Sequence, residues 1–238
     1  MLMSISFNKQ KTLDITLSIL HSIFYLFFSL TLGITFILFC RSFFYMCIDL
    51  LNLTYYADRS YIELKTCYDS LMDSLIFFEP FSLGNVFIYS EEGMNHFLDC
   101  VPLFLLNNIV FLVTSIGLII TTTLLKLKKF TLLKFKNFSI KSWISFFVLF
   151  LLLIIVIWAL INFYTLFSAF HHIFFPGKSN WVFYPDKDPI INMFQESFFA
   201  LCAGVIGITF GVLLLIPIIK DIYLIIKNKK SKKEIKNI

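Results

Sequence analysis

The sequence predicts an all-α membrane protein with four transmembrane helices and an extracellular cap formed by an amphipathic helix and loops. Of the 238 residues, 58% are hydrophobic and only 15% are charged, whereas about 25% of the residues in an ordinary globular domain are charged. A soluble protein of this composition would expose large apolar patches. We therefore expect one integral membrane domain over residues 1–238.

Four apolar runs exceed the roughly 20 residues that a spanning helix needs. The expected spans cover residues 13–40, 101–125, 143–167 and 198–226. The first is too long for a cleaved signal peptide and has no small-residue cleavage site. It contains His21, which is either a functional site or, more simply, the partner in a helix–helix hydrogen bond.

The lysines predict the orientation of the spans. Six lysines and no acid lie in residues 126–142, and six more lysines with a single acid follow the fourth span. The positive-inside rule therefore places both termini and the 126–142 loop in the cytoplasm, with segments 41–100 and 168–197 outside. These lysines also suit contact with anionic membrane lipids, and no nucleic-acid partner is expected.

The outer segment 41–100 is too long for a bare connection and should be folded. Residues 61–78 place apolar side chains on one side of a helix, with Lys65, Asp69 and Asp73 on the other. This pattern predicts an amphipathic helix lying on the outer leaflet. A second helix is expected to begin near Glu91 and to run into the second span, where Pro102 either kinks it or begins a new helix.

Two histidines are predicted to lie at a similar depth, at the outer surface of the membrane. His96 precedes the second span by about five residues, and His171 follows the third by about the same number. An imidazole has an unperturbed pKa near 6.5, so it can accept and return a proton at neutral pH. The pair therefore indicates a proton-transfer site, with His172 as a weaker candidate. The plain alternative is that they are ordinary interfacial histidines.

Other chemistries have weaker support. Asp99 and the histidines could bind a metal ion, but no HExxH occurs and the spacing fits no standard zinc pattern, so we expect neither metal nor cofactor. Candidate nucleophiles lack the GxSxG elbow of serine hydrolases; they are Ser90, Ser168, Ser179 and Cys100. Cys100 could pair with His96 or be a structural thiol. Without a CxxC motif, one bridge among Cys47, Cys67 and Cys100 stays open.

The loop after His171 contains two further candidates for support. Trp181 and its neighbours are typical of the aromatic belt at a membrane interface. Asp186 and Asp188 lie between Pro185 and Pro189, which indicates a rigid turn, and either carboxylate could orient a histidine.

Two blocks resemble the signature of a family of four-span bacterial membrane proteins, the lipoprotein intramolecular transacylases. The first block contains Phe170-His171, Phe174-Phe175, Trp181, Phe183, Pro185, Asp188, Ile190 and Phe198-Phe199. The second contains Glu91-Glu92 and His96-Phe97-Leu98-Asp99-Cys100, with Tyr68-Asp69 and Leu71-Met72 upstream. Cys100 replaces a commoner aliphatic residue, and Gln195 stands where the family usually has proline.

The resemblance implies an enzyme of the bacterial plasma membrane whose substrates are diacylglyceryl lipoproteins. The sn-2 acyl chain would move to the α-amino group of the N-terminal cysteine, giving an N-acyl S-monoacylglyceryl lipoprotein. His96 and His171 would be the catalytic histidines, with His172, Asp99, Trp181 and Asp188 in support. The alternatives are another outer-leaflet acyltransferase or hydrolase, and a transporter or assembly factor, although no inverted repeat is detected.

Overall fold

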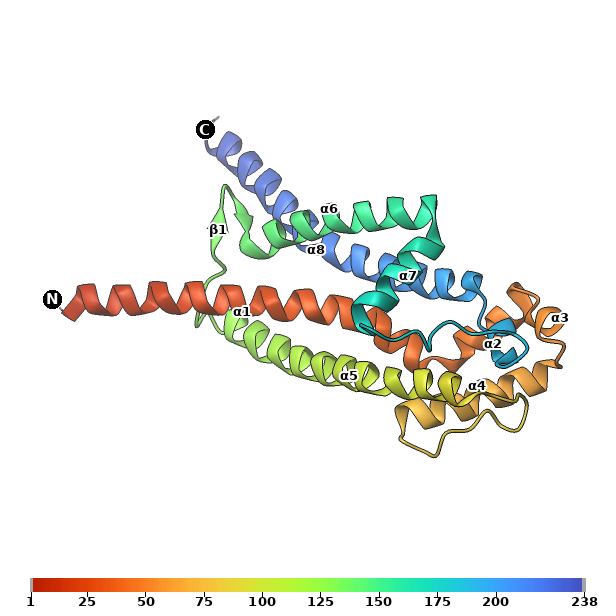
Figure 1. Cartoon of the computed structure of the whole chain (residues 1–238). Coiled ribbons are helices and arrows are strands. Elements are labelled where there is room, and N and C mark those ends of the chain that lie inside the picture. Colours follow the sequence, from red (N-terminus) through yellow and green to blue (C-terminus); the bar gives the residue numbers. More distant parts are fainter. Residues whose placement is uncertain (1, 237–238) are drawn as a thin grey trace. The chain divides into compact units, whose positions relative to one another are not determined.

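The computed structural model describes the backbone of residues 2–236 and the side chains of residues 9–231. The helices and strands, in chain order (Figure 1), are α1 (Leu2–Phe39), α2 (Arg41–Leu50), α3 (Leu53–Ala57), α4 (Tyr61–Ile76), α5 (Glu91–Lys126), β1 (Lys134–Phe135), β2 (Phe138–Ser139), α6 (Ile140–Ile161), α7 (Phe163–Phe174), the 3₁₀ turn η1 (Pro189–Asn192) and α8 (Glu196–Lys236). Strands β1 and β2 pair antiparallel as a small hairpin. The predicted all-α class is confirmed.

Among the described residues, four helices are long and apolar enough to cross a membrane: α1, α5, α6 and α8. This confirms the predicted number of spans. The side chains of Lys232, Lys233 and Lys236, which contribute to the predicted orientation, lie outside the described residues.

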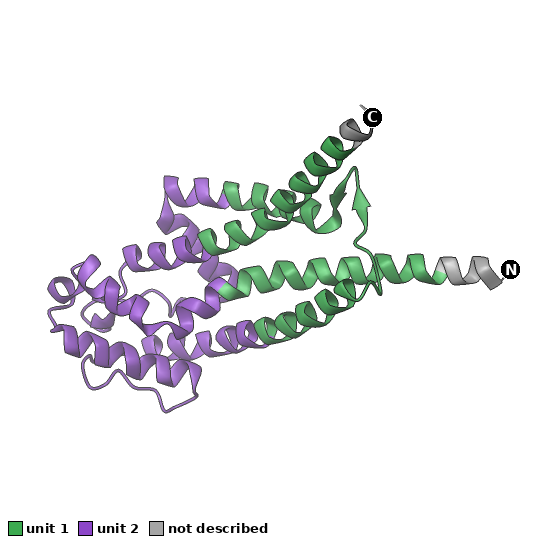
Figure 2. Ribbon diagram, turned by 180° about the vertical axis from the view of Figure 1, so that it is seen from behind, with its two compact units in different colours: residues 1–32, 110–154, 207–238 green, residues 33–109, 155–206 purple. Residues whose placement is uncertain are grey.

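The chain divides into two compact units, which Figure 2 colours separately. Unit 1 comprises residues 1–32, 110–154 and 207–238, and unit 2 comprises residues 33–109 and 155–206. Unit 2 contains the histidine-bearing segments and a buried hydrophobic core from α2, α3, α4 and the 190–198 region.

The third span ends earlier than residue 167, so that predicted boundary is wrong. Helix α6 stops at Ile161 because Asn162 leaves helical geometry, with φ −158° and ψ 96°. The Asn162 side chain accepts a hydrogen bond from the Thr165 backbone N–H at 3.0 Å, and Asn162 thereby caps α7. Asparagine is among the residues that N-cap positions prefer. The apolar run after Asn162 therefore belongs to α7, which continues into the predicted outer loop.

Helix α4 confirms the predicted amphipathic helix but not its surroundings. It begins with a capping box, in which the Ser60 side chain accepts from the Glu63 N–H and the Glu63 carboxylate accepts from the Ser60 N–H. Its apolar face is buried in the core of unit 2, where Leu64 and Leu71 are at most 1% exposed. Tyr68 stacks on Phe44 of α2 with ring centroids 3.9 Å apart. Protein therefore covers most of this face, and the expectation that the whole face lies on the outer leaflet is wrong; Ile62 and Phe78, near its two ends, are exposed.

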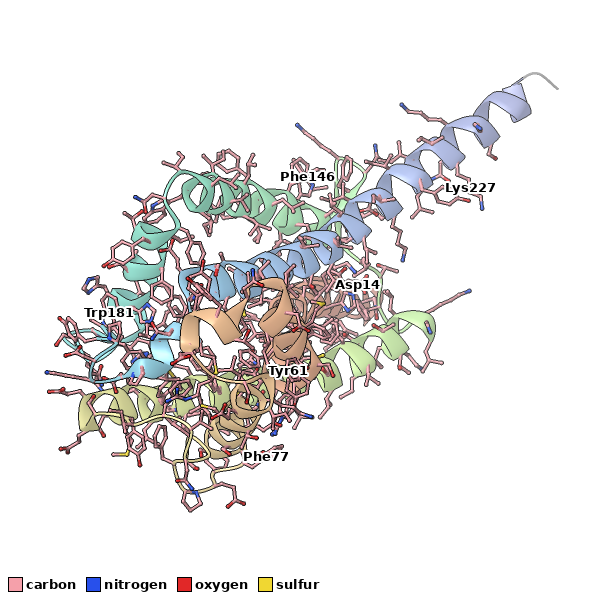
Figure 3. The ribbon with its side chains drawn as sticks, turned by 90° about the vertical axis from the view of Figure 1, so that its right-hand side faces the viewer. Asp14, Tyr61, Phe77, Phe146, Trp181 and Lys227 are labelled. Atoms are coloured by element: carbon pink, nitrogen blue, oxygen red, sulfur yellow. The ribbon has the colours of Figure 1, made fainter. Side chains whose placement is uncertain are left out.

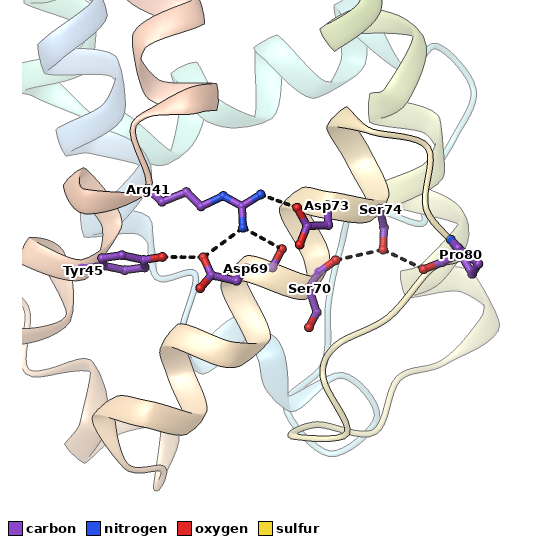
Figure 4. Close-up of polar contacts among 7 residues, drawn as sticks. All are labelled: Arg41, Tyr45, Asp69, Ser70, Asp73, Ser74 and Pro80. Carbon is purple, nitrogen blue, oxygen red and sulfur yellow. Dashed lines mark hydrogen bonds and ion pairs between the residues drawn. The ribbon is translucent and has the colours of Figure 1, made fainter.

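The polar side of α4 binds α2 through Arg41 (Figure 4). The Arg41 guanidinium forms ion pairs with both Asp69 and Asp73, and the Tyr45 hydroxyl donates a hydrogen bond to Asp69 at 2.5 Å. Ser74 of the same helix contacts the Pro80 carbonyl oxygen at 2.9 Å, which holds the following loop. Asp69 and Asp73, which the helical pattern places on the polar side of α4, therefore join α4 to α2.

His21 makes a helix–helix hydrogen bond within unit 1. Its Nδ1 lies 2.9 Å from the Thr121 hydroxyl oxygen, and that hydroxyl lies 2.7 Å from the Gly117 carbonyl, to which it donates. Thr121 therefore accepts from the imidazole. A Cβ on Gly117 would overlap the Phe24 ring, so the glycine allows α1 and α5 to approach closely. The simpler interpretation of His21 is supported.

Candidate active site

Both candidate catalytic histidines belong to unit 2, one on each of two helices. His96 lies in the second turn of α5, which continues through Pro102 without a break. His171 lies near the end of α7. A turn follows at Pro176-Gly177, where Gly177 has φ 74° and the Lys178 N–H donates to the Phe175 carbonyl at 3.1 Å. Glycine suits the positive φ that such a turn requires.

The structure brings the two imidazole rings together, with their centroids 5.7 Å apart. Both side chains are buried, His96 with 7% and His171 with 6% of its surface exposed. Aromatic rings surround them. Phe175 lies 5.0 Å from His96 and 5.7 Å from His171, and Phe183 lies 5.6 Å from His96. Helices distant in sequence therefore form one histidine pair inside an aromatic enclosure.

The hydrogen bond of His171 fixes its tautomer. Its Nδ1 lies 2.8 Å from the Phe167 carbonyl oxygen. A carbonyl oxygen can only accept, so Nδ1 carries the hydrogen and the neutral ring keeps its lone pair on Nε2. Burial lowers the pKa of His171 below its usual 6.5, the Phe167 hydrogen bond opposes that shift, and the charge of His172 adds to it. A neutral imidazole with a free Nε2 is suited to accept a proton.

His96 has a buried nitrogen without a partner. Its Nδ1 forms no hydrogen bond with any described residue. Leaving a buried polar atom unpaired costs free energy, so such an atom in a native protein calls for an explanation, of which a catalytic role is one. The feature distinguishes His96 from His171, whose Nδ1 is satisfied.

Trp181, which Figure 3 labels, packs against His171 of the histidine pair. Its indole stacks on His171 with centroids 4.7 Å apart and an interplanar angle of 27°, and its Nε1–H donates to the Lys178 carbonyl at 3.1 Å. His172 meets the same indole edge-on at 5.6 Å and is exposed. An aromatic belt alone would not explain the stacking of Trp181 on a buried histidine.

Asp99 ties the Trp181 loop to α5. Its carboxylate forms an ion pair with Lys178 and accepts a hydrogen bond from the Asn180 amide at 3.0 Å. It lies one turn after His96 on the same helix. Asp99 therefore fixes the position of the loop relative to the helix that carries His96.

Asp188 holds the beginning of α5. The buried carboxylate accepts hydrogen bonds from the Ser90 N–H and the Ser90 hydroxyl, both at 2.8 Å, and the Ser90 hydroxyl oxygen accepts from the Gly93 N–H at 2.9 Å. A negative charge at a helix N-terminus is favourable. Among the described residues Asp188 bonds to no histidine. It supports the pair indirectly, by fixing the start of the helix that carries His96.

This contact accounts for two residues whose roles sequence reasoning missed. Ser90 was a candidate nucleophile, but it caps α5. Gly93 was given no role, yet it lies against Asp188. Two features of the sequence could have revealed these roles. Ser90 lies three residues before Gly93, and Asp188 lies between two prolines. Cys100 also departs from the suggested Cys–His pair, because its thiol contacts the His96 backbone carbonyl at 3.4 Å.

Replacing Gly93 with alanine is expected to destabilise unit 2. The added Cβ would collide with the Asp188 carboxylate and lie 3.2 Å from the Phe183 ring. Overpacking of this kind typically costs ~1–3 kcal/mol. Thermal unfolding in detergent measures the effect. Gly204→Ala is the matched control, because a Cβ there meets nothing within 4 Å. Equal melting temperatures for the two variants would contradict the proposed fit.

The cysteines and acids suggest no further chemistry at this site. All five cysteines are free thiols, so the structure contains no bridge among Cys47, Cys67 and Cys100. Within the described residues, no group of three or more His, Cys, Asp or Glu side chains could hold a metal ion.

Comparison with known proteins identifies the family. The family model described as lipoprotein intramolecular transacylase Lit matches residues 19–199. The solved structure of the membrane integral lipoprotein intramolecular transacylase Lit from Bacillus cereus is 26% identical, with a TM-score of 0.78 over 93% of this chain and 100% of that one.

Two variants of the Bacillus cereus protein were also matched. One, in which a histidine is replaced by arginine, has 25% identity and a TM-score of 0.71, covering 95% of this chain and 98% of that one. The other, with alanine replacing a histidine, has 24% identity and a TM-score of 0.72, covering 94% and 99%. No curated protein matches the chain. The chain belongs to the lipoprotein intramolecular transacylase family and is therefore a membrane-integral acyltransferase.

Proposed function

We propose that this acyltransferase moves the sn-2 acyl chain of a diacylglyceryl lipoprotein to the α-amino group of its N-terminal cysteine. The product is an N-acyl S-monoacylglyceryl lipoprotein. The observation that carries the proposal is the buried pair of His96 and His171, with ring centroids 5.7 Å apart, in a chain of this family. Membership of this family favours a bacterial plasma membrane protein. The lysine distribution favours cytoplasmic termini and an outward-facing histidine pair.

In the first step, the substrate amine attacks the ester carbonyl carbon. The amine must be neutral to do so, and a free α-amino group has a pKa of about 7.7–8.0. The new N–C bond leaves a positive charge on nitrogen and a negative charge on the former carbonyl oxygen. The Nε2 lone pair of His171 takes the proton from nitrogen, a role supported by the Phe167 hydrogen bond at Nδ1.

In the second step, the carbonyl re-forms and the bond to the sn-2 oxygen breaks. The departing glycerol oxygen takes one proton, which balances the proton lost by the amine. Protonated His171 is the source of this proton. The neutral ring of His96, which lies beside it, is the candidate to hydrogen-bond the oxyanion and to relay the proton: one ring nitrogen donates to the departing oxygen while the other accepts the proton of His171. After this relay His171 has lost the proton that it took from the amine, and both rings are again neutral.

The enclosure favours transfer over hydrolysis. Phe175, Phe183 and Trp181 cover histidines that are 6–7% exposed, which limits the access of water to the ester. Because nucleophile and ester belong to the same substrate molecule, positioning them supplies much of the rate enhancement. This division of work requires no nucleophile from the enzyme.

The test uses a lipoprotein whose sn-2 acyl chain alone carries a heavy isotope. Incubation with the purified full-length protein, followed by mass spectrometry of the N-terminal lipopeptide, should place the label on the α-amino nitrogen and leave a free hydroxyl at sn-2. Label released as free fatty acid would instead indicate a hydrolase. An unlabelled N-acyl chain would indicate a second lipid as donor, and either result would refute the proposal.

The titration of His171 provides a pH-dependent prediction. Because burial lowers its pKa below 6.5, the ring should remain a neutral base under mildly acidic conditions. The free energy of unfolding should then decrease as the pH falls from 6.5 through the folded-state pKa, because the unfolded chain binds this proton more tightly. ¹⁵N NMR of labelled histidines, assigned with His171→Gln, measures the pKa and the tautomer. A pKa above 6.5 or an Nε2–H tautomer would contradict this assignment.

A further inference from the structure

A second site of distinct chemistry lies in unit 1, where a cavity of about 410 Å³ is lined by lysines and apolar side chains. The lysines come from the loop after α5, from β1, from the first turn of α6 and from α8. They are Lys128, Lys134, Lys141 and Lys220. None of the lining residues belongs to the unit that holds His96 and His171.

The cavity has an excess of positive charge. Asp221 is its only acidic lining residue among the described side chains. That carboxylate is already occupied, since its Oδ2 accepts hydrogen bonds from the Ser139 N–H at 2.8 Å, the Ser139 hydroxyl at 2.8 Å and the Ser142 hydroxyl at 2.6 Å. Within residues 9–231, none of the four lysines forms an ion pair. No carboxylate therefore neutralises these lysines by direct contact, and they can bind an anion.

Other features favour an anion that carries an apolar part. Phe130, which is 1% exposed, and Pro217 line the same cavity as the lysines. Lys141 rests on the ring of Tyr25, with its Nζ 4.2 Å from the centroid. Lys220 and Asp221 lie inside the fourth predicted span, where charged residues are rare and commonly functional. A surface serving only to set membrane orientation would not need such a cavity.

We propose that this cavity binds the phosphate-bearing headgroup of an anionic phospholipid such as phosphatidylglycerol. The lysine ammonium groups donate hydrogen bonds to the phosphodiester oxygens, and the apolar side chains contact the glycerol and the first acyl carbons. Basic pockets between transmembrane helices on the cytoplasmic side are known to bind such headgroups. On the topology proposed above, the loop 126–142 and therefore this cavity face the cytoplasm.

The experiment compares lipid retention by the full-length protein and two paired variants. Each protein is purified in detergent, stripped of lipid and titrated with phosphatidylglycerol or phosphatidylcholine, and bound lipid is counted by native mass spectrometry. Lys134→Gln with Lys220→Gln should lower the affinity for phosphatidylglycerol by about tenfold or more. Lys227→Gln with Lys229→Gln is the matched control. Lys227, labelled in Figure 3, is an exposed lysine on α8 three residues after Leu224, the last α8 residue that lines the cavity. This control pair should bind as the parent does.

Charge-preserving variants separate binding from folding. Lys134→Arg with Lys220→Arg should retain the lipid, and thermal unfolding should be similar for all variants. Equal retention by the glutamine pair and the parent, or equal loss in the control pair, would overturn the proposal. Finally, the stabilisation of the parent protein by inorganic phosphate is compared with its stabilisation by phosphatidylglycerol. If phosphate stabilises the parent as strongly as phosphatidylglycerol at the same concentration, the assignment to a lipid is overturned.

Discussion

Replacing His171 with glutamine is expected to slow acyl transfer by about two to four orders of magnitude, the usual contribution of a positioned acid–base group. The reason is specific to one atom. Because Nδ1 donates to the Phe167 carbonyl at 2.8 Å, Nε2 is the acceptor, and the amide of glutamine is not basic enough to replace it. Mass spectrometry of lipoprotein N-termini, in cells or with purified protein, measures the fraction of N-acyl product.

His172→Gln is the matched control. His172 is adjacent in sequence, contacts the same Trp181 and is exposed to solvent. We expect nearly full activity from this variant, with a small rise in the pKa of His171 because the neighbouring charge is removed. Normal product formation by His171→Gln, or equal losses in the two variants, would refute the assignment of His171 as the base.

The fold class and the membrane helices could be predicted because their signals are local. Runs of more than twenty apolar residues identify spanning helices whatever surrounds them. That His96 and His171 lie near the ends of apolar runs could be read from the sequence, although the helix before His171 ends at Ile161 and not at residue 167. That the two rings meet could not be predicted in this way, because their contact depends on how α5 and α7 pack within unit 2.

The errors occurred where a local pattern has more than one physical interpretation. The apolar face of α4 requires burial, but the pattern is the same whether lipid or protein covers it, and here Phe44 and its neighbours do. The apolar run through residue 167 concealed a helix end because Asn162 is one of only a few polar residues within it. The partner of Asp188 is Ser90, nearly a hundred residues earlier, and no local pattern announces such a pair.

Replacing His96 with leucine provides the sharpest separation of function from stability. We expect transfer to fall by about two to four orders of magnitude, while the melting temperature stays level or rises. The buried Nδ1 of His96 has no partner among the described residues, and such an atom costs ~1–3 kcal/mol. Leucine removes that cost. It also loses the ring contacts with Phe175 and Phe183, worth ~0.5–1.5 kcal/mol each, so the two effects offset.

His171→Leu is the comparison that gives this result its meaning. Native His171 lies in the same enclosure as His96, but its imidazole donates a hydrogen bond to the Phe167 carbonyl oxygen. Losing a typical hydrogen bond costs ~1 kcal/mol. We therefore expect inactive proteins in both cases, with the lower melting temperature in His171→Leu. A histidine retained for packing would stabilise the fold, so marked destabilisation by His96→Leu would indicate a structural residue. An inactive variant that is no less stable would indicate a residue that the fold tolerates at a cost because the reaction requires it.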